Sequence, residues 1–210
     1  MPVNAACRDK SLYQRELYNR SRITRGYWDY RDKVALSFIG REDKLIVDIG
    51  CGEGITLGHS KSLHPDKRVI GLDRILENLF ICRKYRNEAV GGDVFHLPFK
   101  NNSFDCALLI EVIEHISGPD AVISEIRRIL KPQGKLILIF PNDFIFKLAR
   151  VLTFKFREAL FDPGHLRQWS PKDIRALLKR QGFSVMKEGS MPFYFWHLSL
   201  HHFVVCKKAN

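Results

Sequence analysis

The sequence predicts an α/β domain built on a doubly wound, mostly parallel sheet. Short, almost continuously apolar runs alternate with helix-like segments, which is typical of a parallel sheet covered by helices on both faces. A glycine-rich stretch, VDIGCGEG at 47–54, overlaps the end of the first run. The strand-like runs are KLIVDI (44–49), RVIGLD (68–73), EAVGGD (88–93), DCALLIE (105–111) and GKLILIF (134–140).

Helical segments separate these runs. The spacing of apolar residues predicts helices over 55–63, 75–86 and 119–130, with a short helical turn at 112–116. A last helix, SPKDIRALLKRQG at 170–182, has favourable residues at its start and its stop. At 210 residues and 45% hydrophobic composition, the chain fits one globular domain.

The net charge of +11 is unevenly distributed. Residues 45–140 carry equal numbers of acidic and basic side chains, so the excess lies in 1–44 and 141–210. These basic ends could form one positive surface or simply solvated faces. The amino-terminal residues lack the apolar core of a secretory signal, and no apolar run is long enough to span a bilayer. We therefore expect a cytoplasmic protein.

Cysteine and histidine spacing does not predict a metal site. No C-x-x-C pair occurs, so we expect the cysteines to be reduced and buried. Three histidines near the carboxyl terminus, His197, His201 and His202, fall on a strand-like segment that would not put all of them on one face. The five cysteines are Cys7, Cys51, Cys82, Cys106 and Cys206.

Acidic residues follow the predicted strands. In a doubly wound sheet, ligands bind at the carboxyl ends of the strands, near the point where strand order reverses. Each of the five strand ends contains an acid. The positions at these ends are 48–54, Asp73, Asp93, Glu111 and 141–143.

The glycine-rich stretch differs from two phosphate-binding loops. Its spacing is G-x-G-x-G, so it lacks the third glycine of the dinucleotide fingerprint G-x-G-x-x-G, and no G-K-[ST] follows as in a P-loop. Two acids, Asp48 and Glu53, would repel a pyrophosphate at the mouth of this loop but attract an ammonium or sulfonium group. We therefore expect a ligand with a cationic tail.

The next two acids suit a nucleoside. Asp73 could accept hydrogen bonds from both ribose hydroxyls, or it could cap the helix that begins near Ile75. Asp93 could bind the exocyclic amine of an adenine, with Val94 packed on the ring, or it could form a turn. A nucleoside with a positively charged tail has the shape of S-adenosyl-L-methionine.

Four ordered segments of the chain resemble the class I S-adenosylmethionine-dependent methyltransferases. The third segment looks most like the small-molecule subgroup that includes quinone-biosynthesis methyltransferases (methyltransferase type 11). A weaker similarity extends over 165–183. The four segments are VDIGCGEG (47–54), VIGLDR (69–74), GGDVFHLPFKNNSFDCALLIEVIEHI (91–116) and LKPQGKLILIFPN (130–142).

This resemblance implies a Rossmann-like, seven-stranded sheet in the order 3-2-1-4-5-7-6, with one antiparallel strand. The segments 183–189 and 201–208 would supply the remaining two strands. It also implies one methyltransferase domain over 1–210. We expect its parts to be an amino-terminal helical cap (1–44), a cofactor-binding core (45–140), an acceptor-side insert and helix (141–182) and the last two strands (183–210).

The resemblance also implies the cofactor-binding residues. Asp48 would help to hold the amino group, and Glu111 would lie near the methionine part and the reacting centre. An aromatic of the amino-terminal segment would close over the cofactor, with Tyr27, Trp28 and Tyr30 as candidates. The remaining implied contacts are Gly50, Cys51 and Gly52 in the loop, Asp73 and Arg74 at the ribose, and Asp93 and Val94 at the adenine.

Methyl transfer is an in-line displacement for which the protein supplies alignment, water exclusion and, where needed, a base. Two histidines are candidate bases, because histidine titrates in the useful range. His115 lies one turn after Glu111, and His165 lies in the segment DPGHLRQW. His115 could instead bond within its own turn, and His165 could cap the following segment. The candidate catalytic residues are therefore His115, His165 and Glu111.

The acceptor should be recognised outside the core. Residues 144–161 are richer in aromatic and basic side chains than one buried helix face requires. They could cover a hydrophobic acceptor, contact an anionic membrane surface peripherally, or form a buried helix pair. We expect a small or lipid-like acceptor of quinone, isoprenoid or glycolipid type. A nucleic-acid methyltransferase and a non-catalytic cofactor-binding module stay as alternatives, and a nicotinamide-dependent oxidoreductase is more distant.

Overall fold

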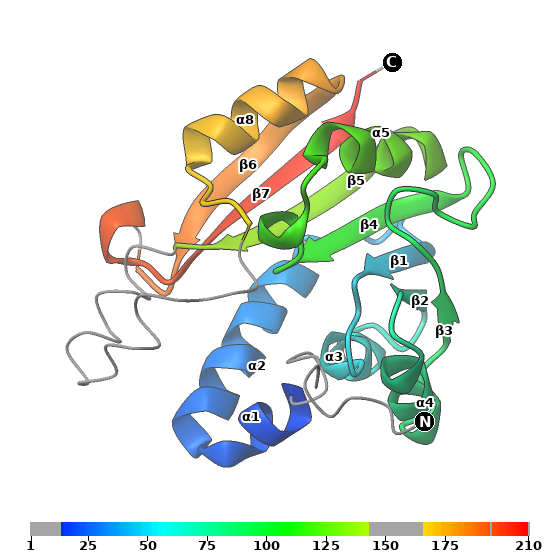
Figure 1. The fold of residues 1–210 in the computed structure, drawn as a ribbon, viewed down its shortest axis with the longest axis vertical. Coiled ribbons are helices and arrows are strands. Elements are labelled where there is room, and N and C mark those ends of the chain that lie inside the picture. Colours follow the sequence, from blue (N-terminus) through cyan, green and yellow to red (C-terminus); the bar gives the residue numbers. More distant parts are fainter. Residues whose placement is uncertain (1–13, 143–165, 194, 210) are drawn as a thin grey trace, which may run out of the picture.

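The computed structural model describes residues 14–142, 166–193 and 195–209. In these residues seven strands form one sheet in the order β3-β2-β1-β4-β5-β7-β6, which confirms the predicted order (Figure 1). β7 runs antiparallel to β5 and to β6, and the other pairs are parallel. The strands are β1 (Leu45–Ile49), β2 (Arg68–Asp73), β3 (Ala89–Gly91), β4 (Phe104–Ile110), β5 (Leu130–Pro141), β6 (Phe183–Met191) and β7 (His201–Lys208).

Helices cover both faces of the sheet (Figure 1). Buried side chains of α5 and α8 pack on one face, and those of α2, α3 and α4 pack on the other. α1 contacts α2 beside the second group. The helices are α1 (Gln14–Arg20), α2 (Arg22–Leu36), α3 (Ile55–Leu63), α4 (Leu76–Lys84), α5 (Pro119–Ile129) and α8 (Pro171–Arg180), with short 3-10 turns η2 (Ile113–His115) and η3 (Trp196–Leu198).

Local sequence explains where most elements begin and end. The helix predicted over 170–182 is α8, and its start is a capping box: the Ser170 hydroxyl accepts from the Asp173 N–H, and the Asp173 carboxylate accepts from the Ser170 N–H. Several details differ from the sequence-based expectation: the helix expected over 75–86 spans Leu76–Lys84, and the strand expected over 88–93 spans Ala89–Gly91. β5 begins at Leu130, ahead of the expected 134, and His197 lies in η3 and not on a strand.

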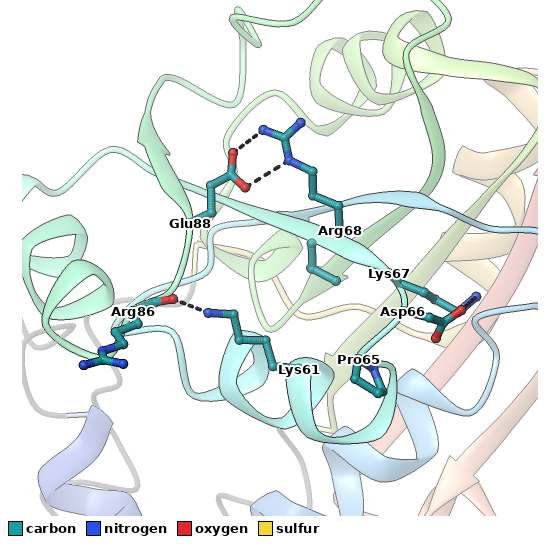
Figure 2. A pocket seen from close by; sticks show the side chains of 8 residues that line it. Lys61, Pro65, Asp66, Lys67, Arg68, Arg86 and Glu88 are labelled. Atoms are coloured by element: carbon teal, nitrogen blue, oxygen red, sulfur yellow. Dashed lines mark hydrogen bonds and ion pairs between the residues drawn. The ribbon is translucent and has the colours of Figure 1, made fainter.

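The amino edge of the sheet holds a hollow of about 490 Å³ (Figure 2). Its charged side chains are largely paired with one another or with the backbone. Arg68 forms an ion pair with Glu88 at 2.5 Å, and the Lys61 ammonium donates to the Arg86 carbonyl. The hollow lies where β2 and β3 begin, so it is at the opposite edge from the glycine-rich loop.

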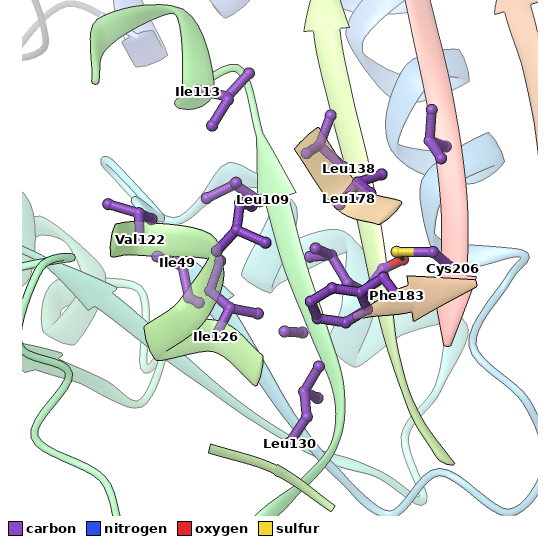
Figure 3. Close-up of a cluster of buried hydrophobic side chains, with 14 of the residues drawn as sticks. Ile49, Leu109, Ile113, Val122, Ile126, Leu130, Leu138, Leu178, Phe183 and Cys206 are labelled. Atoms are coloured by element: carbon purple, nitrogen blue, oxygen red, sulfur yellow. Dashed lines mark hydrogen bonds between the residues drawn. The ribbon is translucent and has the colours of Figure 1, made fainter. Parts of the chain in front are cut away.

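The larger core lies between the sheet and helices α5 and α8 (Figure 3). Residues at alternate strand positions point into it, so Val47, Ile49, Ala107 and Leu109 share this core, while Ile46 and Leu108 face α2. This alternation decides which strand residues can meet α2 at the ligand-binding edge.

Some predictions fall on residues that the structure does not describe. The segment 144–161 and His165 lie outside the described residues, as does Cys7. The four described cysteines are buried and have free thiols. Among the described residues, no helix is both long and apolar enough to cross a membrane. The division of the chain into one domain with four parts stays a prediction.

A core substitution tests the packing of α5. Ile126 is fully buried between α5 and the sheet, so Ile126→Ala should lower the free energy of unfolding by about 2–5 kcal/mol, through lost burial and the cavity left behind. Val185 on β6 is 38% exposed, so Val185→Ala serves as the control and should change stability by less than about 1 kcal/mol. Urea denaturation measures both; equal effects would contradict the assigned core.

Candidate active site

The glycine-rich loop joins β1 to α3 at the carboxyl edge of the sheet. Gly50, Gly52 and Gly54 all have positive φ, at +75°, +52° and +73°, which side-chain-bearing residues rarely adopt. A Cβ on Gly50 would come within 2.5 Å of Val112. The Gly50 N–H also donates to the Leu72 carbonyl at 2.7 Å. The loop is therefore held close against the ends of β2 and β4.

Glu53 does not face an open ligand site, which corrects the expectation from its charge. Its side chain is buried, and its carboxylate accepts the backbone N–H groups of Gln14 at 3.1 Å and Arg15 at 2.9 Å. The Arg15 guanidinium donates to the Glu53 carbonyl at 2.9 Å. The N–H groups at the start of α1 need acceptors, and Glu53 supplies them. Glu53 thus docks α1 on the loop.

Gly52 contacts the protein's own chain. A Cβ at this position would clash with the side chain of Gln14, whose Oε1 accepts from the Glu53 N–H at 3.2 Å. The expectation that Gly52 lines the cofactor stays a prediction. Cys51, beside it, is buried.

Asp48 is a buried acid with an unused oxygen. It is 3% exposed, and its Oδ2 has no hydrogen-bond partner in the part of the chain that the structure describes. The pKa of Asp48 is raised to about 7, first by burial and then by the negative charges of Asp32 and Asp73, against the opposing charge of Arg31. A cationic group beside this oxygen would stabilise the ionised carboxylate.

Asp73 binds the loop and the start of α4. Its carboxylate accepts from the N–H groups of Gly52 at 2.8 Å and Ile75 at 2.9 Å, and from the Asn78 amide at 3.2 Å. Asp73 therefore holds the turn before α4, although the N-cap residue of this helix is Ile75 and not Asp73. Ribose binding stays a prediction. Arg74, next to it, is exposed.

Asp93 and Val94 follow β3. Asp93 is exposed, and its Oδ1 accepts from the Phe95 N–H at 3.0 Å, which is the turn geometry considered for it. Val94 is half-buried against the larger core. Their contacts with an adenine stay predictions.

Glu111 brings two residues together that the sequence did not single out for catalysis. It has a φ of +54° directly after β4, and its Oε1 lies 2.9 Å from Arg31 Nη1 and 2.5 Å from His201 Nε2. Tyr27 Oη lies 2.5 Å from His201 Nδ1, and the two rings stack with centroids 5.6 Å apart. Arg31 and His201 are buried, at 4% and 2% exposure.

The charges of this cluster are mutually compensated. Burial alone would raise the pKa of Glu111, but the Arg31 charge and the His201 contact hold that pKa well below its usual range. Burial raises the pKa of Tyr27, and the Glu111 charge raises it further against the opposing effect of Arg31. Glu111 is therefore an ionised carboxylate, and Tyr27 is a protonated phenol.

Residue spacing gives a weak sequence signal for the residues around Glu111. Tyr27 and Arg31 are four positions apart, so they share one face of α2. His201 and His202 begin β7 and point to opposite faces. His202 contacts Ser190 at 2.9 Å, on the side away from α2, and burial lowers the pKa of His202 to about 4. The pattern alone did not say which histidine meets α2.

The candidate base His115 does not join this cluster. Its side chain is 45% exposed, and its Nε2 lies 3.9 Å from Glu114 Oε1. A catalytic role for His115 stays a prediction.

Comparison with known proteins agrees with the geometry of the loop and the sheet. Residues 47–138 match the family model described as a methyltransferase domain. This part of the chain is therefore similar to the methyltransferase domains of that family. The matched residues include the glycine-rich loop, Asp48 of β1, Asp73 of β2 and Glu111.

The chain is similar to curated proteins over half or more of its length. A Mycolicibacterium smegmatis protein assigned as an S-adenosylmethionine-dependent methyltransferase is 28% identical over 76% of this chain and 60% of its own length. An uncharacterized Methanocaldococcus jannaschii protein is 41% identical over 50% of this chain and 44% of its own length. A demethylmenaquinone methyltransferase of Lactobacillus johnsonii is 32% identical over 52% of this chain and 50% of its own length. The chain spans about half the length of the curated relatives it matches.

Solved structures share the fold of this chain. A methyltransferase solved in complex with the Haloferax volcanii Trm112 methyltransferase activator has a TM-score of 0.74 at 19% identity, with 95% of this chain and 96% of that chain covered. A Pyrococcus horikoshii protein has a TM-score of 0.70 at 22% identity, with 90% and 92% covered. At these identities the likeness shows the fold, and the quinone-biosynthesis subgroup is not confirmed.

The pKa of Asp48 predicts a pH-dependent stability. Because the folded-state pKa is about 7 and the ordinary value is 3.8, the folded protein holds a proton between these pH values that the unfolded chain has lost. The free energy of unfolding of the ligand-free protein should therefore fall by an amount on the order of a few kcal/mol as pH rises from about 4 to about 7, and level off above that pH. In Asp48→Asn, the contribution of Asp48 to this pH-dependent loss of stability should be absent.

Urea denaturation at pH 5 and pH 8 measures the effect. Asp66→Asn is the matched control, because the Asp66 side chain is 63% exposed at the opposite edge of the sheet. An Asp48→Asn protein that loses as much stability between the two pH values as the wild type would contradict the assigned pKa.

Proposed function

We propose that the protein transfers the methyl group of S-adenosyl-L-methionine to a small, apolar or lipid-like acceptor. The methyltransferase domain at 47–138 supports the reaction class, and the unused buried oxygen of Asp48 supports the cofactor. An ammonium group beside Asp48 would relieve the unfavourable burial of this carboxylate. The cofactor, when bound, supplies an electrophilic methyl group on a sulfonium.

Each residue around the loop has a proposed part in holding the cofactor. Asp48 would bind the amino group, and the backbone of Gly50 to Gly52 would line the methionine part. Asp73 with Arg74 would lie at the ribose, and Asp93 with Val94 at the adenine. The Asp73 carboxylate already fixes the loop through the Gly52 N–H, so ribose hydroxyls would meet an acceptor held in place.

The apolar connection between β6 and β7 carries the proposal for the acceptor. This connection begins after Met191 and ends at His201. Met191 and His201 are partners in the β6–β7 pairing, and His201 is also the partner of Pro141 at the end of β5. The connection therefore lies at the same edge as Glu111. Its exposed apolar side chains are Phe193, Phe195 and Leu198, at 58%, 67% and 62% exposure. Exposed apolar groups beside a reaction site favour an apolar acceptor.

One relative supports this acceptor class and another supports a different one. The Lactobacillus johnsonii relative is named for a quinone acceptor. A Macaca fascicularis tRNA (carboxymethyluridine(34)-5-O)-methyltransferase is 34% identical, but over 45% of this chain and 14% of its own length. The apolar connection favours the first class, and RNA methylation is an outcome that the experiment below can reveal.

Labelled cofactor identifies the acceptor class. The protein should be incubated with methyl-labelled S-adenosylmethionine and an extract of its source cells, which is then divided into an organic-solvent phase, a small-molecule aqueous phase and RNA. We expect the label in the organic phase. Label that enters RNA and is released by ribonuclease would replace the proposed acceptor class with nucleic acid.

Removal of the Asp73 carboxylate tests the cofactor site. Asp73→Ala should weaken S-adenosylmethionine binding more than tenfold in calorimetry, because it removes both the ribose acceptor and the anchor of the Gly52 N–H. Asp66→Ala is the control and should bind like the wild type. Unchanged affinity in a folded Asp73→Ala protein would reject the site assignment.

A further inference from the structure

A chain of close polar contacts runs from α2 to the ion pair of Arg31 and Glu111. Tyr27 Oη meets His201 Nδ1 at 2.5 Å, His201 Nε2 meets Glu111 Oε1 at 2.5 Å, and the same oxygen meets Arg31 Nη1 at 2.9 Å. Tyr27 is half-buried, whereas His201 is 2% exposed. An acceptor molecule could therefore reach the tyrosine without reaching the histidine.

The protonation states follow from the partners. The Glu111 carboxylate is ionised and can only accept, so the proton of the neutral His201 ring lies on Nε2, the nitrogen that faces this carboxylate. His201 Nδ1 then has a lone pair, which accepts from the Tyr27 hydroxyl. Because Tyr27 donates its single proton to His201, the Tyr27 oxygen can only accept from a further partner. The relay, defined here as Tyr27, His201 and Glu111, thus presents an acceptor-only oxygen.

The relay lies beside the cofactor loop. Gly50 packs against Val112, which follows Glu111 directly. His201 begins β7 at the edge where the apolar connection ends. The Tyr27 hydroxyl is therefore held by the same elements that carry the loop on one side and the apolar connection on the other.

We propose that Tyr27 is a catalytic residue that takes the proton of a hydroxyl group on the acceptor, and that His201 and Glu111 are positioning residues that receive and hold this proton. This inference rests on the proposed function and makes it more specific, because it assigns methylation to oxygen. A weakly acidic hydroxyl, such as a phenol, matches the tyrosine in acidity and supplies the donor that its oxygen lacks.

The proton transfer balances. The acceptor O–H proton moves to Tyr27 Oη while the Tyr27 proton moves to His201 Nδ1. The acceptor oxygen forms its bond to the methyl carbon that the cofactor supplies, and the electron pair of the broken C–S bond stays on sulfur. The resulting imidazolium faces the Glu111 carboxylate, and the same path in reverse returns the proton to solvent. The negative charge of Glu111 disfavours a standing tyrosinate at Tyr27.

Nitrogen-15 NMR tests the relay without any acceptor. In labelled protein bound to S-adenosylhomocysteine at pH 7.5, His201 should be neutral with the proton on Nε2. Tyr27→Phe should keep this tautomer and shift the Nδ1 resonance toward that of an unbonded lone pair. The His202→Gln variant separates the two neighbouring histidine signals. A proton on His201 Nδ1, in either the neutral or the charged ring, would overturn the relay.

Turnover tests the catalytic role. With labelled S-adenosylmethionine and the extract phase that the wild type labels, Tyr27→Phe should reduce turnover by about 10²–10⁴-fold. Its affinity for S-adenosylhomocysteine should stay within about threefold of the wild type. Tyr85→Phe is the matched control, because Tyr85 follows α4, away from the relay, and is 52% exposed. Glu111→Gln should lower turnover and change the His201 tautomer.

The outcomes separate the two proposals. Label transfer that Tyr27→Phe leaves undisturbed, or a product methylated on nitrogen or carbon, would overturn the proton role alone. A wild-type protein that binds the cofactor but labels no fraction would reject the proposed function, and the proton role with it.

Discussion

The buried charge of Arg31 constrains the whole ligand-binding edge. A guanidinium that is 4% exposed needs carboxylates around it, because an unpaired buried charge is strongly unfavourable. Glu111 supplies one at 2.9 Å, from the end of β4, and Asp32 supplies another at 2.8 Å, from the same helix. The requirement fixes α2 over the sheet edge. It also gives a physical reason for the left-handed backbone of Glu111, whose carboxylate must turn toward both α2 and β7.

The electrostatic influence of this charged group reaches from α2 to the glycine-rich loop. Asp32 contacts His59 of α3 at 2.7 Å, and this hydrogen bond raises the pKa of His59. Asp32 also adds to the burial that raises the pKa of Asp48. Asp48 is on the α2 side of β1, because its neighbours Val47 and Ile49 point into the opposite core. The acids of α2 and of the glycine-rich loop therefore share one electrostatic environment. A cationic ligand group there would compensate their negative charge.

Most of the fold could be predicted because its signals are local. Apolar runs gave the strands, and spacing gave helices such as 55–63, which is α3 without change. The site was harder, since a carboxylate in a sequence does not reveal its partner. Glu53 suited a cationic ligand by charge, but it meets backbone N–H groups of α1. That contact joins segments far apart in the chain, and no local pattern encodes it.

The alternation of side chains along β7 could have predicted which face of the sheet His201 is on. In β7, Phe203 and Val205 face α2, whereas Val204 and Cys206 face the opposite core. His201 has the parity of Phe203, and the antiparallel direction of β7 places it opposite Pro141, at the carboxyl edge of β5. A parallel last strand would have put this residue at the amino edge, away from Glu111. The antiparallel strand thus carries a histidine from the end of the chain to the site where β4 delivers its acid.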